Sequence, residues 1–182
     1  MHYLLYGNGI THNHSVSCAN IKQLLPLRIS LPAPINGDFP TLEFTSQGQF
    51  TLPDYLRFGA LHIVSQPLAA LLQQFDIPHQ CFAVSWQHNG EPQPRYVAHF
   101  LGEHAAQDEQ QSQLVRDEEG FIDRIEKLVL DEQQLTDVHL TQLAQCWNAI
   151  YIVSDAFRQV VKQTQLTGMV FKQPQDCQEY GY

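Results

Sequence analysis

The chain has 182 residues, of which 43% are hydrophobic, and carries a formal net charge of −9 at pH 7. This length and apolar content predict a folded domain and exclude global disorder, while the acidic charge excludes a nucleic-acid-binding protein, which needs a basic face for phosphates. No apolar run approaches the roughly 18 residues that cross a membrane, and the N-terminus lacks a signal peptide's basic region, so we expect a cytoplasmic protein without a membrane partner.

Residues 1–51 are predicted to form a strand and a proline-rich segment. The run HYLLY, from His2 to Tyr6, is a strand candidate that the turn-forming GNG closes. Four prolines and one glycine in LPLRISLPAPINGDFP favour an extended segment or loop over a regular element. The following TLEFTSQGQFTL predicts a hairpin that turns at Gly48.

Residues 52–102 are predicted to form a strand–helix–strand unit. LPDYLRFG resembles a short helical turn closed by Gly59, and ALHIVS is an apolar strand. Ser65 ends that strand and is a candidate N-cap for a helix whose apolar face recurs at Leu68, Leu71 and Leu72. CFAVSW then predicts the return strand.

Residues 103–135 form an acidic connecting segment. Between Glu103 and Glu132 there are ten Asp or Glu residues and three Lys or Arg residues, which give −7 of the total charge of −9. One interpretation is a solvated connector, and the other is a docking surface for a cationic protein.

Residues 136–182 are predicted to form a second strand–helix–strand unit with a loose tail. LTDVHLTQLAQCW fits a helix or a strand, and AIYIVS predicts a strand. Ser154 is the candidate helix N-cap, and Asp155 lies in the first turn, where the helix dipole favours negative charge. Gly168 is the predicted helix end, before the return strand MVF.

The two helical segments have similar sequences and indicate an internal repeat. HIVSQPLAALLQQFDI begins at His62 and YIVSDAFRQVVKQTQL begins at Tyr151, 89 positions later, and their apolar positions coincide. Two equivalent packing units explain this agreement better than two active sites do. We therefore predict an α+β fold, with a single compact domain (1–182) containing two similar strand–helix–strand units.

The sequence resembles a family of immunity proteins from bacterial polymorphic toxin systems. The resemblance rests on PDYL, on the two IVS segments with their helices, on FID, and above all on YIVSDAFRQVVKQTQLTGMVF from Tyr151 to Phe171. It implies a protein without enzymatic activity or cofactor that protects cells by binding a cognate toxin. In this interpretation Ser65, Ser154, Asp155 and Gly168 are structural caps.

The acidic segment is the candidate toxin-binding surface. A basic toxin would suit its charge, and the residues that we select are Asp108, Glu109, Asp117, Glu118 and Glu119. The sequence does not fix the oligomeric state.

Two alternatives stay open at this point. THNHSVSC contains His12 and His14, whose spacing allows both to bind one metal ion in a metal-dependent hydrolase, but no second ligand cluster of suitable spacing accompanies them. The other alternative is a non-enzymatic adaptor domain. The four cysteines form no CxxC pair and are expected to be reduced thiols.

Overall fold

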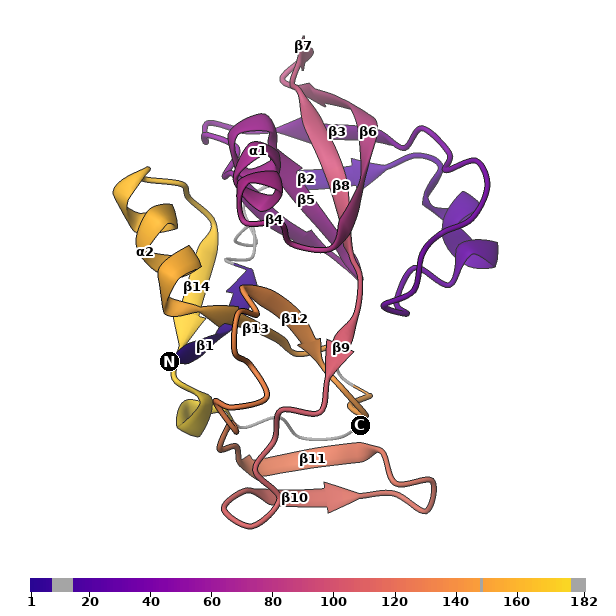
Figure 1. Ribbon diagram of the computed structural model, residues 1–182. Coiled ribbons are helices and arrows are strands. Elements are labelled where there is room, and N and C mark those ends of the chain that lie inside the picture. The colour runs from indigo at the N-terminus through magenta and orange to yellow at the C-terminus, as the bar shows by residue number, and fades with distance from the viewer. Residues whose placement is uncertain (8–14, 148, 178–182) are drawn as a thin grey trace. The chain divides into compact units, whose positions relative to one another are not determined.

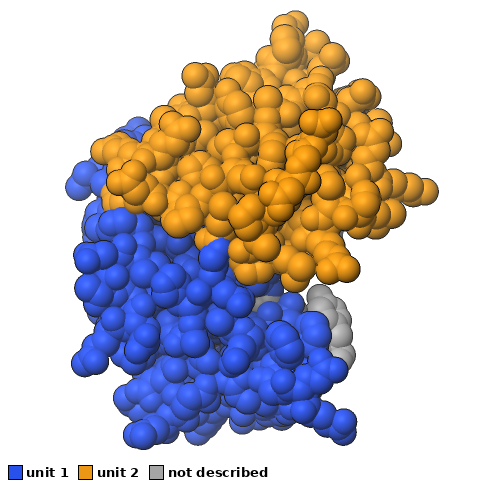
Figure 2. Space-filling model, turned by 45° about the vertical axis from the view of Figure 1, so that its right-hand side comes forward, with its two compact units in different colours: residues 1–6, 102–165, 170–182 blue, residues 7–101, 166–169 orange. Residues whose placement is uncertain are grey.

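The computed structural model describes residues 1–7, 15–147 and 149–177 (Figure 1). The chain divides into two compact units, which Figure 2 distinguishes by colour. Unit 1 comprises residues 1–6, 102–165 and 170–182, and unit 2 comprises residues 7–101 and 166–169. Neither unit is one continuous stretch of sequence, and the boundaries expected at 51, 102 and 135 stay predictions.

Unit 2 is built around a mixed sheet with the strand order β2-β3-β6-β8-β5-β4, and β7 pairs with the edge of β6. Its strands are β2 (Ser15–Cys18), β3 (Glu43–Gln47), β4 (Tyr55–Phe58), β5 (Leu61–Ser65), β6 (His79–His88), β7 (Glu91–Pro92) and β8 (Arg95–Phe100). Its helices are the 3₁₀ helix η1 (Ile21–Leu27) and α1 (Gln66–Gln74).

The core of unit 2 depends on aromatic and β-branched side chains from neighbouring strands. Phe44 of β3 stacks on Trp86 of β6, with ring centroids 4.7 Å apart. The buried indole N–H of Trp86 donates to the hydroxyl of Ser46 at 2.9 Å, so the ring is buried without an unpaired donor.

Unit 1 contains a sheet with the order β14-β1-β13-β12-β9 and a separate ribbon, β10–β11 (Figure 1). The strands are β1 (His2–Gly7), β9 (Glu103–His104), β10 (Gln113–Arg116), β11 (Ile122–Lys127), β12 (Leu140–Leu143), β13 (Tyr151–Ser154) and β14 (Met169–Lys172). The helices are α2 (Asp155–Gln163) and the 3₁₀ helix η2 (Pro174–Asp176).

The ribbon shares the core of unit 1 with the sheet. Ile122 and Ile125 of β11 are each 1% exposed and pack in one cluster with Leu4 of β1, Leu143 of β12 and Ile152 of β13. The ribbon is therefore anchored by apolar packing on one face, although it shares no ladder with the larger sheet in the part of the chain that the structure describes.

The mixed α+β class is confirmed, with strands predominating. Three local predictions are wrong. PDYL leads into strand β4 instead of a helical turn, and β3 forms no hairpin at Gly48 because its partners are β2 and β6. Helix α2 ends at Gln163 with Thr164 as its C-cap, so Gly168 does not terminate it.

Each α-helix connects two strands that flank one intervening strand. Strands β5 and β6 lie on either side of β8, and β13 and β14 lie on either side of β1. The intervening strand comes from a distant part of the sequence in the second case, where His2 is opposite Ser154. The internal repeat itself stays a prediction.

Candidate functional site

The negative charge of the chain is concentrated in unit 1. That unit contains 14 of the 19 Asp and Glu residues but 6 of the 10 Lys and Arg residues, a net charge of −8. Unit 2 carries the remaining −1. A charged partner responds to such a summed field over long distances, so unit 1 is where an electrostatic docking surface is expected.

The turn between β10 and β11 is organised by Asp117. Its backbone N–H donates to the carbonyl of Phe121 at 3.0 Å. One carboxylate oxygen accepts from the backbone N–H groups of Glu119 and Phe121, at 3.0 and 2.9 Å. Gly120 has φ +86°, which glycine adopts with little strain, and completes the turn. Asp117 therefore holds the turn in shape.

Trp147 lies against this turn although it follows β12 in the chain. The backbone of Ile122 fixes it: the Ile122 N–H donates to Gln145 at 2.6 Å, and the Ile122 carbonyl accepts from the Trp147 N–H at 3.4 Å. The indole stacks on Phe121 with centroids 4.5 Å apart. Its N–H donates to the second carboxylate oxygen of Asp117 at 2.6 Å, and this bond is the main influence that lowers the pKa of Asp117.

The result is an ordered aromatic ring on the surface. Trp147 remains 59% exposed despite its stacking partner and its hydrogen bond. We call this feature the acidic aromatic tip, defined as Asp117, Glu118, Glu119, Phe121 and Trp147. Glu118 and Glu119 are exposed, and their side chains make no hydrogen bond or ion pair with any residue that the structure describes.

Two of the five predicted docking residues are engaged in local structure outside the tip. Asp108 accepts from the backbone N–H groups of Gln110 and Gln111 and from the Gln111 amide, and the Gln111 backbone bond is the main cause of its lowered pKa. Glu109 pairs with Arg116 at 2.5 Å and accepts from Gln107 at 3.0 Å.

Sequence reasoning missed the two aromatic members of the tip. The segment LTDVHLTQLAQCW fits either a helix, in which Trp147 would share a face with Leu140 and Leu143, or a strand, and neither pattern indicates an exposed indole. The structure forms β12, and Gln145 then adopts a left-handed conformation with φ +55° that redirects the chain toward Ile122. The long-range pairing with Ile122 has no local sequence signal.

Three of the residues expected to cap helices lie at the start of a helix. Ser65 is the N-cap of α1, and its hydroxyl accepts from the backbone N–H of Leu68 at 3.4 Å. Ser154 is the N-cap of α2, and it accepts from Phe157 at 3.1 Å. Asp155 lies in the first turn of α2 and pairs with Arg158 at 2.7 Å, the main influence that lowers its pKa.

Gly168 does not cap a helix. It allows the backbone to pack closely against Pro53 and Tyr55. Its φ is +91°, and a Cβ atom at this position would lie 2.0 Å from the carbonyl oxygen of Tyr55 and 2.8 Å from Cβ of Pro53. The Tyr55 N–H donates to the carbonyl of Thr167 at 3.0 Å. The TG pair is therefore where the chain passes directly against the start of β4.

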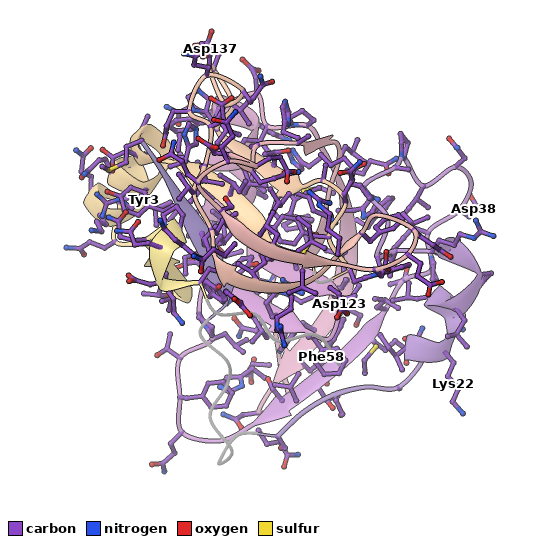
Figure 3. All side chains as sticks on the ribbon, turned by 90° about the horizontal axis from the view of Figure 1, so that it is seen from below. Tyr3, Lys22, Asp38, Phe58, Asp123 and Asp137 are labelled. Atoms are coloured by element: carbon purple, nitrogen blue, oxygen red, sulfur yellow. The ribbon has the colours of Figure 1, made fainter. Side chains whose placement is uncertain are left out.

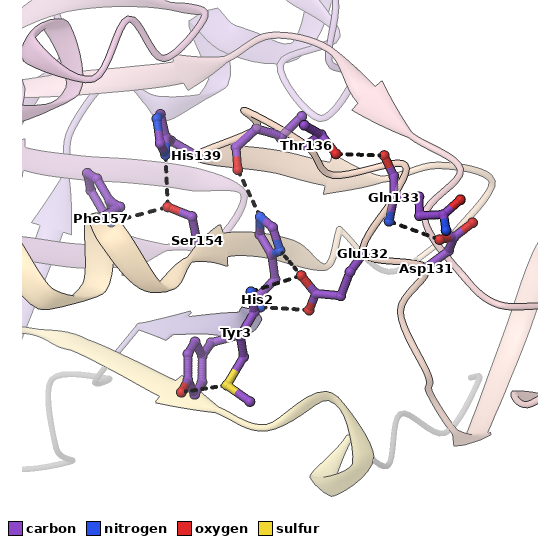
Figure 4. Close-up of polar contacts among 11 residues, drawn as sticks. His2, Tyr3, Asp131, Glu132, Gln133, Thr136, His139, Ser154 and Phe157 are labelled. Atoms are coloured by element: carbon purple, nitrogen blue, oxygen red, sulfur yellow. Dashed lines mark hydrogen bonds and ion pairs between the residues drawn. The ribbon is translucent and has the colours of Figure 1, made fainter.

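A polar network fixes the first residues of the chain within unit 1 (Figure 4). The His2 backbone N–H donates to Glu132 at 2.9 Å, its Nδ1 lies 2.7 Å from the second Glu132 oxygen, and its Nε2 lies 2.9 Å from the carbonyl of Val138. The N-terminal amine pairs with the same carboxylate at 3.0 Å. Burial raises the pKa of Glu132, but the bonds from His2 and the amine outweigh it, and the pKa is lowered. His139 bonds to Ser154 at 2.9 Å nearby.

Unit 2 contains an apolar groove of about 340 Å³. Its lining includes Ile21, Leu24, Leu25, Ile29, Phe58 and Leu61. Phe58 of β4, which lines the groove, and Lys22 of η1, the helix that contributes Ile21 and Leu24 to it, are labelled in Figure 3. The side chain of Leu25 is 81% exposed, so this surface position is apolar, unlike the acidic aromatic tip.

The remaining predictions concern metals and membranes. His12 and His14 lie outside the described residues. Within residues 1–7, 15–147 and 149–177, no group of three or more His, Cys, Asp or Glu side chains is placed to hold a metal ion. The same residues contain no helix long and apolar enough to span a membrane. Cys18, Cys81, Cys146 and Cys177 are free thiols.

Comparison with known proteins adds the family. No curated protein matches the chain. Residues 8–176 match the Immunity protein family (Imm11), which covers nearly the whole chain and confirms the resemblance seen in its IVS and LTG segments. The chain therefore belongs to this immunity protein family.

Proposed function

We propose that the protein acts in the cytoplasm and neutralises a cognate bacterial toxin by stoichiometric binding. The observation that carries the proposal is the family match over residues 8–176. Immunity proteins of this kind typically act without catalysis, and among the described residues no group of three or more His, Cys, Asp or Glu side chains is placed to hold a metal ion.

The acidic aromatic tip is proposed as part of the docking surface. It lies in the unit that carries −8 of the charge, and its exposed Glu118 and Glu119 have no side-chain partner among the described residues. Such carboxylates attract a basic partner and accelerate its association at low ionic strength. Asp108, Glu109 and Asp117 contribute charge to this field, although their side chains also hold local structure.

We also infer that the two strand–helix–strand segments are equivalent packing units. In each segment the helix begins after a serine N-cap. The two strands that the helix connects lie on either side of one other strand of the sheet. This equivalence supports an architectural role for the repeated phrase and leaves partner binding to the acidic segment between the two copies.

The test begins with tagged protein as bait in native cells, with recovered proteins identified by mass spectrometry. Each recovered protein is then expressed alone and together with this chain. The proposal requires one partner that kills cells alone, is harmless on co-expression, and forms a complex of fixed stoichiometry by light scattering. Partners without toxicity would instead favour the adaptor interpretation. A catalytic mode of protection would show as rescue by substoichiometric amounts of this protein.

A further inference from the structure

We propose that Trp147 is the anchor of the toxin interface, and that its exposed ring face receives an arginine or lysine side chain of the toxin. This inference rests on the proposed function and specifies its chemistry. It begins from the combination of an exposed tryptophan, a fixed ring orientation and flanking carboxylates.

The ring of Trp147 is pre-organised for binding. One backbone hydrogen bond, from the Trp147 N–H to the Ile122 carbonyl, holds its main chain, Phe121 packs on one ring face, and Asp117 accepts from the indole N–H. A side chain that is already ordered loses little conformational entropy when a partner covers it. Tryptophan is also among the residues most enriched at the energetic centres of interfaces.

The chemistry that Trp147 offers is that of an electron-rich ring face. Because the indole N–H already donates to Asp117, the ring has no polar donor left for a partner. An aromatic face attracts the guanidinium of arginine or the ammonium of lysine. The exposed carboxylates of Glu118 and Glu119, two and one positions before Gly120 in the same turn, add attraction of the same sign.

The surrounding ribbon strengthens this preference. Asp123 on β11, labelled in Figure 3, is exposed in the strand that follows the turn. The nearby basic side chain of Arg116 is already paired with Glu109, and it donates to the carbonyl of Gly120 at 2.6 Å. Arg116 therefore supports the turn, and Arg124 on β11 pairs with Glu126 at 3.1 Å, so the exposed carboxylates of Glu118 and Glu119 stay available to a partner's cation.

A first experiment needs no toxin. The chain has two tryptophans, and Trp86 is 2% exposed, so ionic quenchers reach Trp147 selectively. The emission of Trp147→Phe gives the Trp86 signal to subtract. Relative to the quenching of a free tryptophan derivative by the same ion, we expect caesium to quench Trp147 several-fold more strongly than iodide does, and a hexa-arginine peptide to change the Trp147 emission at low salt. Glu118→Gln/Glu119→Gln should reduce both effects. Equal quenching by the two ions on this relative scale, or no response to the peptide, would overturn the proposal.

The second experiment uses the toxin recovered in the co-expression test. We expect Trp147→Ala to weaken binding by about 30-fold or more, the loss typical of an interface hot spot. Trp147→Phe keeps an aromatic face and should lose less than about tenfold. Leu25→Ala, at an exposed position of unit 2, is the matched control and should bind like wild type.

The outcomes separate the anchor from the function. Wild-type affinity in Trp147→Ala, with full neutralisation by wild type, overturns the anchor and leaves the immunity function standing. Equal losses in Trp147→Phe and Trp147→Ala would also contradict recognition through the ring face. If Trp147→Ala shows altered circular dichroism, the Glu118→Gln/Glu119→Gln variant decides, because these exposed side chains support no described contact. Unchanged affinity there overturns the cationic partner.

Discussion

The carboxylate of Asp54 accepts hydrogen bonds from both the backbone N–H and the hydroxyl of Thr167, at 2.8 and 3.0 Å, across 113 positions of sequence. Its other oxygen accepts from the hydroxyl of Ser65 at 2.7 Å. One side chain thus joins the PDYL, IVS and LTG segments within unit 2. These three segments are among those on which the family resemblance rests. Their hydrogen bonds to Asp54 indicate that these motif residues stabilise the fold.

Replacing Asp54 with asparagine should destabilise the protein. Burial raises the pKa of Asp54, but hydrogen bonds from Ser65 and Thr167, with Arg95 nearby, outweigh it and lower the pKa, so the charged form is the bonded one. We expect a loss of about 1–2 kcal/mol in the free energy of unfolding, at the lower end for charged hydrogen bonds because the group is partly exposed. Urea unfolding measures it. Asp38→Asn, at an exposed position of unit 2, is the control, and equal stabilities of the two variants would contradict the prediction.

Gly168→Ala tests the close approach at the TG pair. Gly168 and Gly120 have similar positive φ angles, +91° and +86°, but of the two only Gly168 has atoms within 4 Å of an added Cβ. Both alanine variants carry the conformational penalty, of about 1 kcal/mol, and Gly168→Ala adds a clash with the Tyr55 carbonyl. We expect Gly168→Ala to lose at least about 2 kcal/mol more than Gly120→Ala in thermal or urea unfolding. Similar losses would show that the backbone at Tyr55 yields.

The lowered pKa of the buried His62 side chain predicts that the protein loses stability in mild acid. Burial is the main influence that lowers its pKa well below 6.5, and Arg57 and His99 act in the same direction. Since the folded pKa is lower than the unfolded one, the contribution of His62 is fully present above pH 6.5 and is lost as the pH falls toward the folded value. The slope from this group approaches about 1.4 kcal/mol per pH unit.

Urea unfolding at several pH values between 7 and 5 measures this slope. His62→Gln removes the titrating group, so its free energy of unfolding should depend less on pH over the same range, whatever its absolute stability. A slope equal to that of wild type would assign the acid sensitivity to other groups.

Local sequence signals predicted the elements that are defined by near neighbours. The apolar run at Leu61–Ser65 and the helical spacing of Leu68, Leu71 and Leu72 led to β5 and α1, because an N-cap and an apolar stripe are set within one or two turns. Ser154 and the helix that follows it were found by the same signals.

Features that depend on distant pairing were missed or wrong. β3 was assigned to a hairpin, but its register pairs Phe44 with Trp86 in a parallel ladder that local turn chemistry cannot specify. Tyr55 and its neighbours form a strand because β5 and the Thr167 carbonyl pair with them. In the same way, acidic composition located the tip, whereas its aromatic centre required the pairing of Ile122 with the segment before Trp147.

Charge reversal at the tip tests whether the toxin is recognised by a local surface or by net charge alone. Asp117 must stay, because its carboxylate holds the turn and the indole. Glu118→Lys/Glu119→Lys should therefore leave the fold intact and weaken toxin binding by more than about tenfold, with slower association and a smaller dependence of the association rate on ionic strength. Surface plasmon resonance at several salt concentrations measures both quantities.

The matched control for this reversal is Asp38→Lys/Glu91→Lys. Both positions are exposed in unit 2, and the double substitution changes the net charge by the same amount. A local surface predicts that this control loses less than about threefold in affinity, because neither substituted residue belongs to the acidic aromatic tip. Equal losses in the two variants would mean that the toxin senses the total charge of the chain, and the tip would then have no special part in docking.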